Sequence, residues 1–179
     1  GNVGVYAVDL APQTSGPQTD APRTGAIAGG SLGAAAFITF NGNGQTVVGS
    51  KFSPFPGFTG ELRVATADLN GDGTADLVVG AGPGAGPRVV VIDGVTGKTL
   101  RSIFAFEPTF TGGVNVAAVT YTQRDASGNP VLDAAGNPVQ LSLVAVGADN
   151  GGGARVRVFD GATFAQLADF FTFEPSFRG

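Results

Sequence analysis

The chain has 179 residues and a mass of 17.8 kDa, and 30 Gly with 11 Pro occupy 41 of its positions. Such a content is close to that of disordered chains, but 42% hydrophobic residues, 14 Phe and only 13% charged residues indicate a folded protein with glycine in its turns. The lack of Cys excludes disulfides and thiolate metal sites, and the lack of His excludes imidazole bases and the common zinc ligand sets. Because Met is also absent, we expect a processed product or a fragment of a longer chain.

The formal charge of −4 comes from ten scattered cations and fourteen acids, with no basic stripe to follow a phosphate backbone. The longest apolar runs, such as Ala34–Phe40 and Leu143–Ala148, are much shorter than the ~18–20 residues that cross a bilayer. We therefore expect neither nucleic acid binding nor membrane insertion.

An internal repeat organises the chain. Self-similarity at a period of about 50 residues is typical of propellers and solenoids. Here it divides the sequence into units 1–60, 61–112 and 113–179. The matching segments are Phe52–Gly60, Phe104–Gly112 and Phe171–Gly179, Leu77–Ala81 with Val144–Ala148, and Arg88–Gly94 with Arg155–Gly161.

The first unit, 1–60, is divergent. Ala36–Gly42 is its weak counterpart of Arg88–Gly94, and residues 11–25, rich in Pro, Thr, Gln and Ser, are expected to form a surface loop.

The second unit, 61–112, is the clearest. Four short runs rich in Val, Ile and Phe alternate with Asn-Gly, Asp-Gly and Gly-Pro turns, which predicts one antiparallel sheet. No window has a helical apolar period. The predicted strands are Leu62–Asp68, Leu77–Gly80, Arg88–Asp93 and Leu100–Phe106.

The third unit, 113–179, follows the same pattern with an insertion of 15 residues within 121–141. Its near-duplicates Asp125–Val131 and Asp133–Val139 contain Gly-Asn-Pro turns and predict a protruding hairpin or loop. The sequence as a whole predicts an all-β fold of three four-stranded antiparallel sheets.

The turn after the first strand of unit two carries specific chemistry. Oxygen side chains stand at loop positions 1, 3, 5 and 9, a carbonyl is available at position 7, and Gly73 permits the sharp turn. Ca²⁺ takes ~6–8 oxygen ligands, and three carboxylates with an amide suit its charge. An EF-hand would need an acid at position 12, where Val79 stands. The predicted calcium ligands are Asp68, Asn70, Asp72, Thr74 through its carbonyl, and Asp76; the alternative is a tight hairpin turn with solvated aspartates.

The run Val64–Gly94 resembles the FG-GAP (integrin-α-type) β-propeller repeat, which also occurs in large secreted bacterial proteins. The resemblance is strong over 61–112, good over 143–179 and weak before about residue 26. It implies that each unit is a four-stranded propeller blade and that Asp68–Asp76 binds calcium. Since unit one keeps only Asp9 near the equivalent place and unit three has Thr120, we expect one site.

Other features have two interpretations each. Asp125, Asn129 and Asp133 could bind a second ion, but we favour turns. The Phe-x-Phe motifs could form a ligand platform, but core packing between sheets is more typical. Glu107 and Glu174 could act as a carboxylate pair, although equivalent turn residues of a repeat explain them more simply, and Gly80–Gly86 is interpreted as a loop and not a phosphate cradle.

Three blades do not close a ring, which takes typically 4–8. The end sheets must then be covered by further blades of a longer chain, by other copies, or by other proteins. We expect a non-enzymatic, calcium-stabilised scaffold or adhesion module, secreted or at the cell surface or envelope. The alternative is a carbohydrate-binding, lectin-like module with glycan partners, and an enzyme is disfavoured because His, Cys and Trp are all absent.

Overall fold

The computed structural model describes the backbone of residues 23–29, 34–40 and 46–174, and side chains from residue 53 to residue 174. Within these ranges the chain forms eleven strands and no helix, so no described helix could span a membrane. The strands are β1 (Arg23–Gly29), β2 (Ala34–Phe40), β3 (Thr46–Phe52), β4 (Leu62–Ala67), β5 (Asp76–Ala81), β6 (Arg88–Ile92), β7 (Thr99–Phe104), β8 (Val114–Thr122), β9 (Gln140–Ala148), β10 (Arg155–Asp160) and β11 (Gln166–Phe171).

The strands form three antiparallel sheets, each built by hairpins between consecutive strands. The orders are β1-β2-β3, β4-β5-β6-β7 and β8-β9-β10-β11. Two sheets therefore have the four strands that the sequence predicts, whereas the expectation of four strands in unit one is wrong for the described residues, which form three. A counterpart of β4 in unit one would precede residue 23 and lies outside the described residues.

The predicted loop 11–25 also differs at its end. Residues 23–25 pair with Ile38–Phe40 and open β1, because backbone pairing does not require apolar side chains at every position. Residues 11–22 lie outside the described part of the chain.

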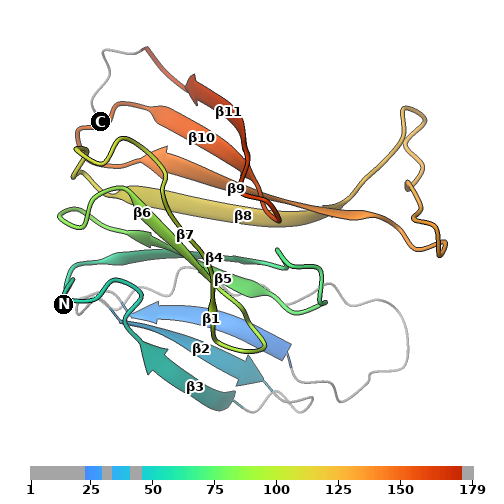
Figure 1. Ribbon diagram of the computed structural model, residues 1–179, viewed down its shortest axis with the longest axis horizontal. Helices are drawn as coiled ribbons and strands as arrows, with labels where there is room; N and C mark the ends of the chain where they lie inside the picture. Colours follow the sequence, from blue (N-terminus) through green and yellow to red (C-terminus); the bar gives the residue numbers. More distant parts are fainter. Residues whose placement is uncertain (1–22, 30–33, 41–45, 175–179) are drawn as a thin grey trace.

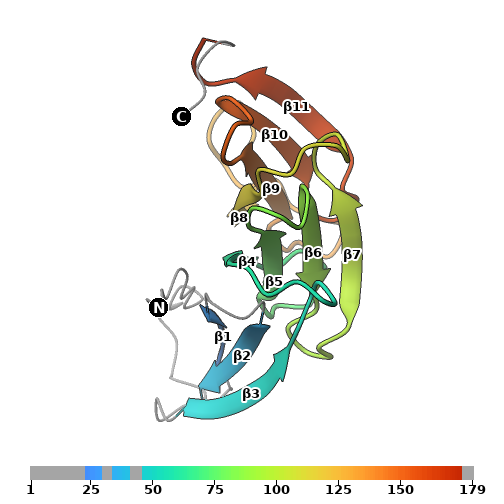
Figure 2. The same ribbon diagram turned by 90° about the vertical axis from the view of Figure 1, so that its left-hand side faces the viewer.

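The three sheets succeed one another in space as they do in sequence. Figure 1 shows them one above another, from β1–β3 at the bottom to β8–β11 at the top. In Figure 2 they fan out along an arc, with the last strands β3, β7 and β11 on its outer side. At the inner side β4 contacts both β1 and β8. The described residues thus form an open row of sheets and not a closed propeller.

The core between the second and third sheets follows from the period-2 alternation of strand side chains. From the second sheet Ala65, Val78 and Val91 point into it, and from the third sheet Val144 and Val146 meet them. All five side chains are buried. Fully burying one of the four valine side chains contributes about 1.5–3 kcal/mol, so this interface holds the two sheets together.

The second sheet is covered on both faces. Its other face contains Val64, Leu77, Val79 and Val90, together with Phe55 from the preceding loop. Every residue of β5 is therefore buried, whereas β7 at the outer edge is mostly exposed. The second sheet is the middle layer of the described structure.

The segment between β8 and β9 projects from the sheets, at the right of Figure 1. Backbone hydrogen bonds among three equally spaced residues hold this segment together. The Val131 N–H donates to the Gln123 carbonyl (2.9 Å), the Val139 N–H to the Val131 carbonyl (2.8 Å), and the Gln123 N–H to the Val139 carbonyl (2.8 Å). The near-duplicate seven-residue segments between them, 124–130 and 132–138, form the two turns.

Arginines join consecutive units. The Arg155 guanidinium lies between the Phe106 and Phe171 rings, 5.7 and 5.9 Å from their centroids, and pairs with Glu107 (3.1 Å) and Asp169 (2.7 Å). Arg157 also pairs with both carboxylates. These contacts attach the end of the second unit to β10 and β11 of the third.

The expected core role of phenylalanine holds only in part. Phe55 and Phe106 are buried, but Phe104 is 54% exposed, and the Arg88 guanidinium lies 6.0 Å from its centroid and 5.2 Å from that of Phe55. A ring at a strand edge can shield a cation while it remains in water. Phe104 is thus one side of an arginine sandwich and not a core residue.

The ion pairs predict a pH dependence. Hydrogen bonds from Arg155, and then from Arg157, lower the pKa of Asp169 to about 2, against about 3.9 in an unfolded chain. A lowered folded-state pKa stabilises the protein above pH ~4, and this contribution disappears as the pH falls toward 2. We expect Asp169→Asn to lower the free energy of unfolding at pH 6 by at most about 1 kcal/mol, with the difference from the parent vanishing near pH 2. A difference unchanged between pH 6 and 2 in urea denaturation would contradict the ion-pair explanation.

A second prediction concerns the junction between units two and three. Gly113 has φ +84°, and an added Cβ would lie 2.5 Å from backbone atoms of Gly82 and Pro83. Gly136 has the same φ, but no described atom lies within 4 Å of its added Cβ. Backbone strain alone costs about 1–2 kcal/mol, so Gly136→Ala serves as a matched control. We expect Gly113→Ala to lower the free energy of unfolding by at least about 3 kcal/mol, and equal losses in both variants would show that the close approach is relieved without cost.

Candidate metal site

The predicted calcium loop connects β4 to β5 at the end of the second sheet. Ala67 pairs with Asp76 as the last rung of the hairpin, and the eight residues between them form the loop. Gly71 and Gly73 have φ values of 80° and 85°, which side chains with a Cβ rarely adopt. The glycines thus allow the chain to curl around its own oxygen side chains.

Three of the predicted ligands face the backbone of the loop. Asp68 accepts hydrogen bonds from the Gly71 N–H (2.7 Å) and the Gly73 N–H (2.8 Å) through its two different oxygens. The side-chain oxygen of Asn70 accepts a hydrogen bond from the Asp72 N–H (3.0 Å). Asp72 accepts from the Thr74 N–H (2.8 Å) and, through its other oxygen, from the Asn70 amide (3.0 Å).

Asp76 has a different role. Its side chain is fully buried, and its two oxygens accept hydrogen bonds from the Leu69 N–H (2.9 Å) and the Gly94 N–H (3.0 Å). Burial raises the pKa of Asp76, and the charges of Asp72 and Asp68 add to this, while the two backbone hydrogen bonds oppose it. The carboxylate therefore ties the loop to the turn that follows β6.

Two supporting residues were not identified from the sequence. The Thr120 hydroxyl of β8 donates to the Asp68 carbonyl (3.0 Å), so the third sheet supports the start of the loop. A Cβ on Gly94 would lie 2.1 Å from the Ala75 carbonyl oxygen, so only glycine lets the two turns meet. Repeat alignment places Thr120 at the position of Asp68, and this could have marked it as a residue of the same corner.

The donor chemistry of the loop fits a hard cation. The side chains of Asp68, Asn70 and Asp72 supply carboxylate and amide oxygens, and a carboxylate oxygen that accepts one N–H keeps a further lone pair. In the described part of the chain, however, no three acidic side chains stand together as a preformed metal cage. Asp76 faces Leu69 and Gly94. The calcium site therefore stays a prediction, and the structure brings its residues into one loop with Asp76 at the buried end.

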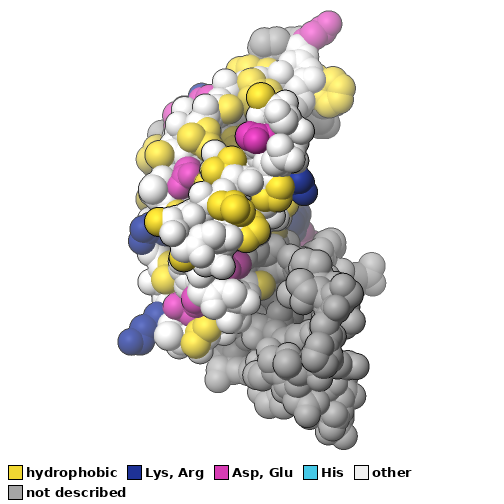
Figure 3. Space-filling view, turned by 90° about the vertical axis from the view of Figure 1, so that its right-hand side faces the viewer, with side chains coloured by type: hydrophobic (Ala, Val, Ile, Leu, Met, Phe, Trp, Pro, Cys, Tyr) yellow, Lys and Arg dark blue, Asp and Glu magenta, His cyan; other side chains and the backbone are white. Residues whose placement is uncertain are grey.

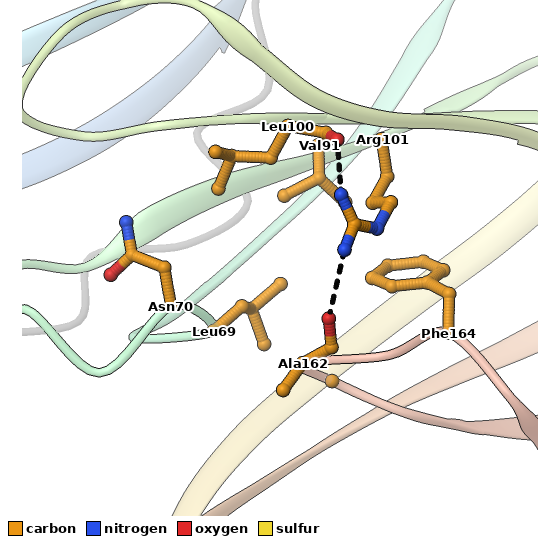
Figure 4. Close-up of a pocket in the computed structure, with 8 residues that line it drawn as sticks. Leu69, Asn70, Val91, Leu100, Arg101, Ala162 and Phe164 are labelled. Carbon is orange, nitrogen blue, oxygen red and sulfur yellow. Dashed lines mark hydrogen bonds between the residues drawn. The ribbon is translucent and has the colours of Figure 1, made fainter.

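A cavity of about 260 Å³ lies beside this loop, between the second and third sheets. Figure 4 shows Asn70 and Leu69 on one side of it and Arg101 and Phe164 on the other. Arg101 donates hydrogen bonds to the Leu100 carbonyl (2.9 Å) and the Ala162 carbonyl (3.3 Å). An amide, a guanidinium and an aromatic ring thus meet at one opening.

The remaining candidates have structural explanations. Asp125 and Asp133 each accept backbone hydrogen bonds within their own turns, as the turn interpretation requires. In the glycine-rich loop the Gly82 N–H donates to the Glu61 carbonyl and the Gly84 N–H to the Thr111 carbonyl. Those donors hold neighbouring loops together.

Comparison with known proteins adds one finding about this region. The family model of the FG-GAP repeat matches residues 62–91. This segment is an FG-GAP repeat. It covers β4, the predicted calcium loop, β5 and most of β6, as the resemblance implied. No curated protein and no solved structure matches the chain. The repeat indicates an interaction module of the β-propeller type.

The buried carboxylate gives a test that does not depend on calcium. Asp76→Asn leaves one acceptor oxygen for two N–H donors, so we expect the free energy of unfolding to fall by about 1–3 kcal/mol in the presence of a chelator. Asp125→Asn is the matched control, because one oxygen of Asp125 accepts from both Ser127 and Asn129, and an amide can do the same. Equal effects of the two substitutions in urea denaturation would show that Asp76 does not tie the two turns together.

Proposed function

We propose that the chain is a non-enzymatic scaffold or adhesion module of the β-propeller type, secreted or held at a cell surface or envelope. The observation that carries the proposal is the FG-GAP repeat at 62–91, placed in a row of sheets that pack face to face. Such a row offers long loops and open sheet faces to partners while its core stays rigid. The end sheets would contact further propeller blades, other copies or other proteins.

Calcium would have a structural role in this module. The loop binds a cation through Asp68, Asn70, Asp72, the Thr74 carbonyl and Asp76, and the positive charge offsets the mutual repulsion of three carboxylates in one loop. A bound cation would then hold the β4–β5 hairpin, and through Thr120 the corner between the second and third sheets, in one conformation. We favour this structural role over catalysis because the side-chain oxygens of the loop lie against its backbone N–H groups and do not provide a separate catalytic acid and base.

The calcium proposal predicts ion-dependent stability. At a calcium concentration 100 times the dissociation constant, binding to the folded state alone adds about 2.7 kcal/mol, which raises the thermal midpoint of a chain of this size by about 5–10 °C. We expect Asp68→Asn to weaken binding at least about tenfold and to remove most of this shift. Calorimetric titration and thermal denaturation measure both quantities.

Asp133→Asn is the matched control for that experiment, because Asp133 is an exposed turn aspartate outside the loop and its turn tolerates an amide. It should keep both the affinity and the thermal shift of the parent. If a chelator leaves the thermal midpoint of the parent unchanged, the structural role of calcium is wrong.

Carbohydrate binding is the second candidate, and the cavity beside the loop is the observation that favours it. Asn70 can exchange hydrogen bonds with sugar hydroxyls, and the Phe164 ring offers an apolar face. We expect any glycan that binds to lose affinity in Asn70→Ala. A glycan array with no binder would favour the scaffold role over the lectin-like one.

A further inference from the structure

The third sheet has one face that no described element covers. Side chains of β8–β11 alternate, and one set, including Val144, Val146 and Phe159, is buried against the second sheet. The other set is mostly apolar, with Asn115 at the start of β8 and Asp160 at the end of β10, and it includes Val119 at 49% and Phe170 at 46% exposed. We call the apolar part of this set the outer face; it consists of Ala117, Val119, Leu143, Ala145, Val156, Val158, Ala168 and Phe170.

Figure 3 views the molecule from the side of the projecting segment and shows hydrophobic side chains dispersed among acidic and basic ones over the described part. Contiguous exposed apolar surface marks contact sites, and the eight residues of the outer face lie on neighbouring strands of one sheet.

The outer face repeats a face that is already covered. In the second sheet, the side chains that the third sheet buries occupy the same repeat positions, at offsets of 52 for the first strand and 67 for the others. Two of these, Val89 and Val91, are 1% exposed, and the residues at the equivalent positions of the third sheet, Val156 and Val158, are also valines. The full correspondence is Ala65 with Ala117, Ala67 with Val119, Val78 with Ala145, Val89 with Val156, Val91 with Val158 and Ile103 with Phe170. The outer face thus has the composition of a surface that receives a following sheet.

The arginine contacts repeat in the same way. Arg88 begins β6, and Arg155, 67 residues later, begins β10. Each guanidinium lies between a Phe of its own sheet and a Phe from the end of the preceding unit: Phe104 and Phe55 for Arg88, Phe171 and Phe106 for Arg155. The arginine at the start of the third strand of a sheet therefore contacts a phenylalanine at the end of the preceding unit.

The third unit ends with the same pair of residue types that contacts the following sheet at the end of the second unit. Phe173 and Glu174 stand at the positions of Phe106 and Glu107, and Phe173 is 66% exposed. Glu107 accepts hydrogen bonds from Arg155 and Arg157 of the following sheet. By the same arrangement, we expect Glu174 to pair with a cationic side chain of the partner that covers the outer face.

We propose that the outer face, together with Phe173 and Glu174, docks a further four-stranded FG-GAP-type sheet whose third strand begins with an arginine. This rests on the proposed scaffold function and names its partner. The first unit of a second copy does not meet the requirement, because Ala36 stands at the position of Arg88. The partner is therefore a different sheet, recognised by its apolar face and by one arginine.

The test uses thiol reactivity, because the chain has no Cys. Residues 61–112, which carry Arg88, are repeated after Gly179, the repeat equivalent of Gly112. A single reporter, Val119→Cys, is placed on the outer face, and Val95→Cys, at an exposed turn position (64% exposed), is the control in the original copy of 61–112. We expect the extension to slow the reaction of the first thiol about tenfold or more and to leave the second unchanged.

The arginine is tested in the added sheet. Arg88→Ala in that copy should restore labelling of the Val119→Cys thiol several-fold, and Arg88→Lys, which keeps the charge but not the planar stacking, should lie between. If the added sheet gives no protection, docking is wrong, and if Arg88→Ala changes nothing, the arginine requirement is wrong.

One further arm distinguishes the occupant. If the Val119→Cys thiol becomes protected in the 179-residue chain as its concentration rises, a second copy covers the face and the named partner is wrong. All arms are run at one fixed calcium concentration, so failure of docking is distinguishable from failure of the calcium proposal, which is measured by titration of the unextended chain.

Discussion

The structure depends on one constraint, that a four-stranded sheet with two apolar faces needs a neighbour on each of them. In β5 every side chain is buried, and Val78 and Val79 belong to the cores on opposite sides of the same sheet. Burial of this kind is the main favourable term in folding, and the second sheet by itself could not provide it. The neighbouring sheets are therefore a condition for the fold of the second unit, which is not a domain that folds first and is arranged afterwards.

The candidate site occupies a corner created by that succession. Its loop begins where β4 ends, Asp76 ties it to the turn after β6, and Thr120 reaches it from the next sheet. Each of these contacts satisfies a polar group close to the core, where an unsatisfied one would be costly. The geometry of the loop is thus set by two sheets, which explains why an ion bound there would stabilise their junction as well as the hairpin.

Repeat alignment and turn residues were enough to predict the strands of units two and three, because Asn-Gly and Asp-Gly turns leave little choice of hairpin. The predicted calcium loop between β4 and β5 was located for the same reason. The role of Asp76 toward Gly94 was not, since the two are 18 residues apart and meet only when β6 has paired with β5. Nor was the exposed position of Phe104, because composition does not distinguish a ring that packs in a core from one that covers Arg88. Contacts between strands and between units need the register, which local sequence does not contain.

Asp68 and Thr120 show that equivalent residues of two units can have different roles. Both stand at the same repeat position, but Asp68 directs its carboxylate into its own loop, while Thr120 donates its hydroxyl to the Asp68 carbonyl of the preceding unit. A carboxylate at position 120 could not donate that hydrogen bond, and its charge would face a carbonyl oxygen. The third unit therefore lacks an acid at this position for a physical reason: its side chain supports the loop before it. In the third unit, the position that begins the predicted cation loop of the second unit thus supports the loop of its neighbour.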